Sequence, residues 1–132
     1  MFLGEVYQVL TIKGDGGSLK VKALVDTGAN VNVVNYSVAR KVFSKDFLDR
    51  EFGGKLDFVH VTDDLKLSGV FVYGAVVIGG EERATSFFVT KEKVGADVLL
   101  GVVLLQQYEG YVDLIKDKLR FRKMSKRKGK WI

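Results

Sequence analysis

An alternating segment that runs straight into an Asp-Thr-Gly-Ala tetrapeptide constrains the fold of this chain more than any other feature. Every second residue from 19 to 25 is apolar, which is the period of a half-buried β-strand. That strand ends at residues 26–29, and a second motif of two leucines and a glycine, residues 99–101, follows about seventy residues later. The glycine-rich turn at 14–17 predicts a hairpin in which residues 2–12 form the first strand and 19–25 the second.

Short β-like segments separated by turns fill most of the remaining chain, which has fifteen glycines and no proline. Helical spacing of apolar residues predicts one helix over 36–48, capped by Asn35 or Ser37, and a shorter one over 102–108. Many short strands with one or two helices predict a mostly-β chain, a small closed barrel or a sandwich. The expected strands are 31–34, 56–61, 65–73, 74–78, 84–90, 97–100, 111–114 and 119–121.

The composition excludes several kinds of site. The chain has no cysteine, so disulfides, thiolate zinc sites and cysteine nucleophiles are excluded. A single histidine, His60, excludes a histidine-rich metal site and argues against a serine–histidine triad; its alternation with neighbours predicts a strand residue. Residues 1–5 do not form a signal peptide, and the apolar run over 94–105 is too short and too interrupted to span a bilayer. We therefore expect an intracellular, cytoplasmic protein.

Positive charge is concentrated at the C-terminus. Residues 116–132 hold nine Lys or Arg and one acid, whereas the other 115 residues carry a net charge of −3 within a total of +5. The length predicts one domain, residues 1–121, followed by a basic tail, 122–132. The basic run over 122–130 is either a solvated end or an electrostatic arm for nucleic acid or an acidic partner, and Trp131 could stack on a base or dock on the protein body.

The two motifs, in this order and at this distance, resemble the active-site signature of the retropepsin-like aspartic proteases. The approach to the second motif over 96–101, followed by Leu104-Leu105, is also similar, and the resemblance covers roughly residues 18–121. It implies a closed β-barrel, hydrolysis of peptide bonds, and no metal or cofactor. Because this chemistry needs two carboxylates and the chain has one Asp-Thr-Gly, it also implies a symmetric homodimer. The alternative is a plain turn that closes a hairpin.

The resemblance assigns a role to each motif residue. Asp26 supplies one catalytic carboxylate per chain, and Thr27 hydrogen-bonds across the two-fold axis. Gly28 permits a tight turn that brings backbone N–H groups near the carboxylates, and Ala29 is small where the substrate backbone passes. The second motif passes through the loop and packs behind the aspartate; its residues are Leu99, Leu100 and Gly101.

A flap that covers the substrate is the next expectation from the resemblance. The hairpin over 58–71 lies midway between the motifs, and its tip is formed by Thr62, Asp63, Asp64 and Leu65. Family flaps often carry a glycine at the tip, and the nearest one here, Gly69, is displaced. The Gly79-Gly80 turn is an alternative tip, and an ordinary surface hairpin is the alternative interpretation.

The chain departs from the viral members of the family at two positions. Where those members often have an acid and an arginine that form an ion pair, this chain has Asn30 and Val102, so its dimer contacts must differ. Asp97 and Asp113 are expected to be structural or solvated. Two other functions stay open: a non-catalytic dimeric module that binds peptides with the same fold, and a nucleic-acid-binding protein that uses the basic tail.

Overall fold

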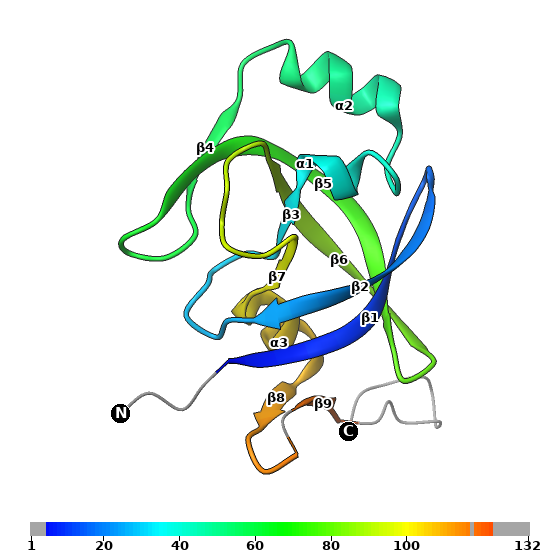
Figure 1. Ribbon diagram of the computed structural model, residues 1–132, viewed down its shortest axis with the longest axis vertical. Helices are drawn as coiled ribbons and strands as arrows, with labels where there is room; N and C mark the ends of the chain where they lie inside the picture. The colour runs from blue at the N-terminus through cyan, green and yellow to red at the C-terminus, as the bar shows by residue number, and fades with distance from the viewer. Residues whose placement is uncertain (1–4, 117, 123–132) are drawn as a thin grey trace.

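A six-stranded closed barrel forms the body of the molecule (Figure 1). The computed structural model describes residues 5–116 and 118–122. The strands run around the barrel in the order β1, β2, β7, β3, β6, β5, and β5 pairs with β1 to close it, while β4 lies outside on the edge of β5. This confirms the predicted closed, mostly-β barrel. The barrel strands are β1 (Val6–Gly14), β2 (Gly17–Val25), β3 (Val33–Asn35), β5 (Lys66–Ile78), β6 (Glu81–Thr90) and β7 (Val98–Leu100), and the edge strand is β4 (Asp57–His60).

The N-terminal hairpin follows the sequence prediction closely. β1 and β2 pair along their whole length, from Val6 opposite Val25 to Gly14 opposite Gly17. Within the described residues the first strand begins at Val6 and extends to the glycine turn, and residues 2–4 of the predicted strand lie outside them. The regular register matters because it fixes where β2 stops, and the next residue is Asp26.

The predicted helix over 36–48 is wrong as a single element. The structure has two helices, α1 (Tyr36–Ala39) and α2 (Lys45–Phe52), with Asn35 capping the first through its side chain, as predicted. Between them two bonds tie the backbone to the β1–β2 turn: the Gly16 N–H donates to the Val42 carbonyl at 2.8 Å, and the Ser44 N–H donates to the Asp15 carboxylate at 2.9 Å. Ser44 then caps α2.

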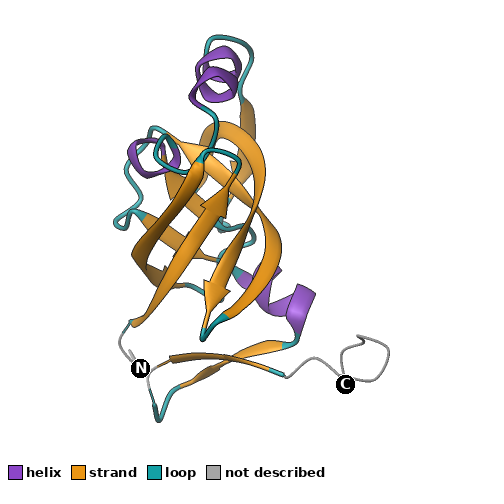
Figure 2. Ribbon diagram, turned by 90° about the vertical axis from the view of Figure 1, so that its right-hand side faces the viewer, coloured by secondary structure: helices purple, strands orange, loops and turns teal. Residues whose placement is uncertain are grey.

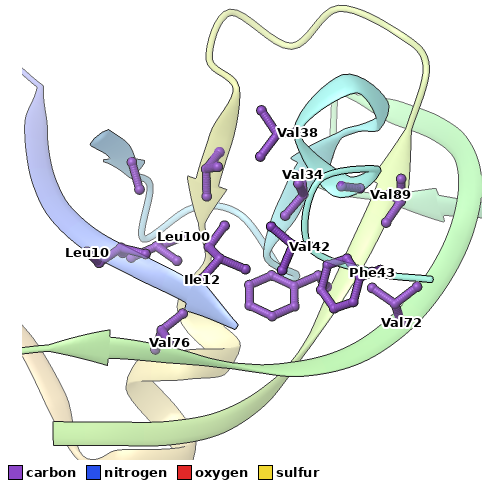
Figure 3. Packing of buried hydrophobic residues seen from close by; sticks show 14 of the residues in the cluster. Leu10, Ile12, Val34, Val38, Val42, Phe43, Val72, Val76, Val89 and Leu100 are labelled. Atoms are coloured by element: carbon purple, nitrogen blue, oxygen red, sulfur yellow. The ribbon is translucent and has the colours of Figure 1, made fainter. Parts of the chain in front are cut away.

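Two apolar clusters lie on opposite faces of the same strands. The larger one fills the barrel (Figure 3). The smaller one lies outside it and combines Ala29, Val61 and Leu67 with one residue from each of β3, β6 and β7: Val33, Phe88 and Leu99. Their chain neighbours Val34, Val89 and Leu100 belong to the larger cluster, because successive side chains of a strand point to opposite faces. The sheet around the second motif is therefore covered on both faces.

The two C-terminal strands are present but lie outside the barrel. The predicted helix α3 (Val102–Tyr108) is confirmed, but β8 (Gly110–Asp113) and β9 (Lys118–Phe121) form a separate two-stranded sheet beside it (Figure 2). Three short helices are thus present among the described residues, rather than one or two. Among residues 5–116 and 118–122, no helix is long and apolar enough to cross a membrane. Residues 123–132, most of the predicted tail, lie outside the described residues, so the domain boundary stays a prediction.

Candidate active site

Asp26 lies at the point where β2 leaves the barrel. Its backbone N–H donates to the Leu100 carbonyl at 2.9 Å, which extends the parallel pairing of β2 with β7 by one residue. The Ala29 N–H returns to the Asp26 carbonyl at 3.1 Å and closes a tight turn. Within that turn, the Gly28 N–H donates to Oδ1 of Asp26 at 2.9 Å. A backbone donor to a carboxylate is a strong, charge-assisted hydrogen bond, so it orients the carboxyl group.

The carboxyl group is accessible. Asp26 is partly exposed, whereas Thr27 and Gly28 are exposed and Ala29 is fully buried. Apart from the Gly28 N–H, no hydrogen bond or ion pair engages the Asp26 side chain within the described ranges. The loop therefore presents one oriented, partly exposed acid, and it is anchored by the buried Ala29.

The second motif packs directly behind this loop. β7 runs between β2 and β3, parallel to the first and antiparallel to the second, so that Leu99 is paired with both Leu24 and Val33. The Val102 N–H donates to the Ala29 carbonyl at 2.7 Å. The structure thus brings together the two motifs that the sequence places about seventy residues apart.

Gly101 is glycine because no side chain fits there. A Cβ atom at this position would lie 2.3 Å from the Val31 carbonyl oxygen and 2.8 Å from the Ala29 carbonyl oxygen. The Ala29 oxygen is itself held by its bond from the Val102 N–H. The tight fit between the residue 26–31 loop and Gly101 therefore depends on the missing side chain.

Sequence reasoning missed Asn32, which connects the two motifs. Its side chain is fully buried, accepts from the Gly101 N–H at 2.9 Å, and donates to the Ser86 carbonyl at 3.0 Å and the Thr85 hydroxyl at 3.2 Å. Its backbone carbonyl accepts from the Phe88 N–H at 2.7 Å. One side chain thus joins the Asp26 loop, the second motif and β6. The available signal was a polar residue within an otherwise apolar run, Val31-Asn32-Val33-Val34.

The predicted hairpin is present next to this loop. β4 pairs with the first residues of β5, and the turn between them, residues 61–65, is closed by the Val61 N–H donating to the Leu65 carbonyl at 2.8 Å. In Figure 1 this turn lies on the same side of the barrel as the Asp26 loop. Of the predicted tip residues, Asp63 and Asp64 are exposed and Thr62 and Leu65 are partly exposed. Their role as a flap stays a prediction.

The alternative tip is far from the site. Gly79 and Gly80 form the turn between β5 and β6, both with positive φ, and lie on the opposite side of the barrel (Figure 1). Gly69, the displaced glycine, lies within β5 opposite Asp57, where a Cβ would be 1.9 Å from the Val89 carbonyl oxygen. Gly69 is therefore a glycine because β5 packs closely against β6 at this position, and not because it lies at the tip of a flap.

Comparison with curated proteins finds relatives of about 30% identity. The chain is 33% identical over 100 residues to DNA damage-inducible protein 1 of Neurospora crassa, which covers 76% of this chain and 22% of the relative. It is 31% identical over 117 residues to UBA domain-containing protein Mud1 of Schizosaccharomyces pombe, covering 89% of this chain and 34% of the relative. The chain thus spans between a fifth and about a third of these relatives' length. No protein-family model matches it.

Three solved structures share the architecture. The retroviral protease-like domain of Ddi1 from Leishmania major aligns with a TM-score of 0.63 and 20% identity, covering 89% of this chain and 87% of that one. A retropepsin-like aspartic protease from Rickettsia conorii aligns with a TM-score of 0.57 and 24% identity, covering 88% of each chain. The EIAV protease, in complex with an inhibitor, aligns with a TM-score of 0.55 and 15% identity, covering 79% of this chain and 88% of that one. These likenesses confirm the fold that the two motifs implied.

Proposed function

We propose that this chain, which has the retropepsin-like fold, is an aspartic endopeptidase that works as a symmetric homodimer. The observation that carries the proposal is the placement of Asp26. Its carboxylate is oriented by the Gly28 N–H and is partly exposed at the end of β2, in a turn whose last residue, Ala29, is buried. A carboxylate that is fixed in orientation and accessible can react with a group from another molecule.

A second copy of the chain would complete the site. Peptide hydrolysis of this class needs two carboxylates about 3 Å apart that share one proton. In a two-fold dimer, the same loop from each copy meets its equivalent, which would bring two Asp26 residues together. Thr27 is exposed beside Asp26, in the place from which it could contact the partner loop. The exposed loop therefore supports the expected dimer.

The chemistry follows from one ionised and one protonated carboxyl group. The ionised group takes a proton from a water molecule, whose oxygen attacks the peptide carbonyl carbon. The protonated group donates a hydrogen bond to the carbonyl oxygen and stabilises the developing negative charge. Collapse of the tetrahedral intermediate breaks the C–N bond, and the amine leaves with a proton from the pair.

An extended peptide is the substrate that suits this geometry. The β4–β5 hairpin lies next to the Asp26 loop and presents Thr62–Leu65 beyond it. A peptide bound as a strand between hairpin and loop would be held through its backbone, with side chains in flanking pockets. A hairpin that closes over it would also exclude water. We propose residues 62–65 as the contacting part.

The decisive experiment compares the wild type with Asp26→Asn in cleavage of a diverse peptide mixture across pH 3 to 8. We expect the wild type to cleave and D26N to lose at least about 10³-fold in rate, since it removes both the base and the acid. D97N is the matched control, because Asp97 is exposed and its described contact is a backbone carbonyl that accepts from the Asn35 N–H. Substantial activity in D26N would refute the mechanism.

Binding measurements on the same protein decide between this function and its alternatives. A folded, dimeric wild type that binds peptides without cleaving them would establish the non-catalytic binding module. Binding of nucleic acid that weakens with salt and is lost on truncation after Phe121 would favour the nucleic-acid alternative. A cytoplasmic location stays a prediction from composition, to be checked by cell fractionation.

A further inference from the structure

We propose that Asn30 is a positioning residue that fastens the β4–β5 hairpin to the Asp26 loop and so sets how the hairpin closes over a bound peptide. The fastening itself is a property of the fold. Its consequence for a peptide rests on the proposed function.

Two donors of Asn30 reach two consecutive carbonyls of the hairpin. The backbone N–H donates to the Val61 carbonyl at 2.7 Å, and the side-chain Nδ2 donates to the His60 carbonyl at 3.1 Å. Asn30 is the residue directly after Ala29, so these bonds start at the turn that holds Asp26. The hairpin is therefore attached to the catalytic loop at one defined place, the end of β4.

An apolar contact lies at the same place. The Val61 side chain is fully buried and belongs to the cluster that contains Ala29, Leu67 and Leu99. Beyond Val61, the turn is closed by its own bonds, in which the N–H groups of Val61 and Thr62 both donate to the Leu65 carbonyl. The turn is thus a self-contained unit whose position is decided at its base, by Asn30 and Val61.

Few other interactions hold β4 in place. β4 is an edge strand of four residues and pairs only with β5 within the described ranges. The Asn30 side chain is exposed, so water competes for its hydrogen bond and the net stabilisation is small. A weak, accessible bond at the base of a hairpin can break and re-form, as a moving cover requires.

The chemistry of the amide explains why Asn suits this position. An ionised acid would offer only acceptor atoms to the His60 carbonyl, which is itself an acceptor, while the Val61 carbonyl would keep its bond from the backbone N–H. The amide supplies the donor that the contact needs. The departure from the acid found in viral members therefore has a structural reason in this chain.

The test measures amide hydrogen exchange of residues 57–68 in the full chain for Asn30→Asp and Asn30→Ala. Both variants lose the side-chain donor at pH 7, so exchange of the hairpin should rise roughly 2- to 12-fold over the wild type, the range for one hydrogen bond. Barrel amides should not change. The control is Asn35→Asp, which makes the same chemical change at the α1 cap, where Asn35 acts as an acceptor for Ser37 and a carboxylate serves equally well.

A second pH separates the specific contact from general loosening. At pH 3 an ordinary aspartate carboxyl, with a pKa near 3.9, is largely protonated and can donate to the His60 carbonyl. N30D should then return to within about twofold of the wild type, while N30A should not. The charged groups on the packed segments are Asp26, Asp57, His60, Asp63, Asp64 and Lys66, together with Glu92, which accepts from the Ser68 N–H. The wild type measured at each pH is the reference for all of them.

Two results would overturn the proposal. Hairpin exchange within twofold of the wild type in both variants at pH 7 would show that Asn30 does not fasten the hairpin. If exchange rises while KM and kcat for a cleaved peptide stay unchanged, the fastening does not set closure; we expect KM to rise more than kcat falls. If the wild type itself cleaves nothing, the exchange result still decides the fastening, and the proposed function fails separately.

Discussion

Replacement of Asn32 by leucine tests whether one buried amide holds the two motifs together. Leucine has nearly the same shape but neither donor nor acceptor. The substitution removes the bonds to the Gly101 N–H, the Ser86 carbonyl and the Thr85 hydroxyl. The Thr85 hydroxyl keeps its bond to Gln107 at 2.8 Å, whereas the Gly101 N–H is left buried without a partner.

The expected loss of stability follows from these contacts. A buried donor left without a partner costs about 1–3 kcal/mol, and each of the other two hydrogen bonds contributes about 0.5–1.5 kcal/mol. The more apolar leucine recovers part of this through burial, at about 25 cal/mol per Å². We therefore expect the free energy of unfolding to fall by about 2–4 kcal/mol.

Urea unfolding, followed by circular dichroism, measures this change. With a slope of about 2 kcal/mol per molar urea, the midpoint should fall by about 1–2 M. Protein concentration must be fixed, because the stability of a dimer depends on it. Thr85→Val is the matched control: it removes one hydroxyl from the same network and should cost about 1 kcal/mol. A loss below 1 kcal/mol in Asn32→Leu would refute the assigned role of this amide.

Two further predictions follow from the geometry. Gly101→Ala forces a Cβ into contact with two backbone oxygens, so it should destabilise by about 1–3 kcal/mol or more and lower cleavage, measured by thermal unfolding and peptide assay. Asp113 accepts from the N–H groups of Lys116 and Ile115 and from Arg120; the Lys116 bond contributes most to lowering its pKa below the usual value. A lowered pKa stabilises the folded state at pH values above the ordinary pKa of aspartate, and this stabilisation is lost as the pH falls through the lowered value. D113N should therefore be less stable than the wild type at pH 7 and equally stable at very low pH. Parallel urea titrations of the two proteins measure this difference.

The sequence predicted the parts of the fold that local pattern determines. Alternating residues located most of the barrel strands, the glycines at 14–17 located the first turn, and the helix at 102–108 was found with its bounds. The resemblance implied that Leu99-Leu100-Gly101 packs behind Asp26, and in the structure β7 pairs with β2 directly before that residue.

The remaining features depend on contacts between distant segments. The helix over 36–48 is divided because the β1–β2 turn competes for its backbone groups at Val42 and Ser44, and helical spacing does not register that competition. β8 and β9 pair with each other instead of joining the barrel, a choice between partners that strand propensity alone does not make. The roles of Asn30 and Asn32 could not be predicted, because their carbonyl and amide partners lie many residues away in the sequence.

The position of β7 between β2 and β3 also has a consequence for how the protein is made. Leu24 pairs with Leu99, and Asp26 bonds to Leu100, so the turn that orients the Asp26 carboxylate packs on a strand from the last third of the chain. During synthesis, Asp26 leaves the ribosome long before that strand exists, and non-local pairing of this kind forms slowly. A partly made chain therefore carries the acid without the strand that orients its turn, and the proposed cleavage would require the closed barrel.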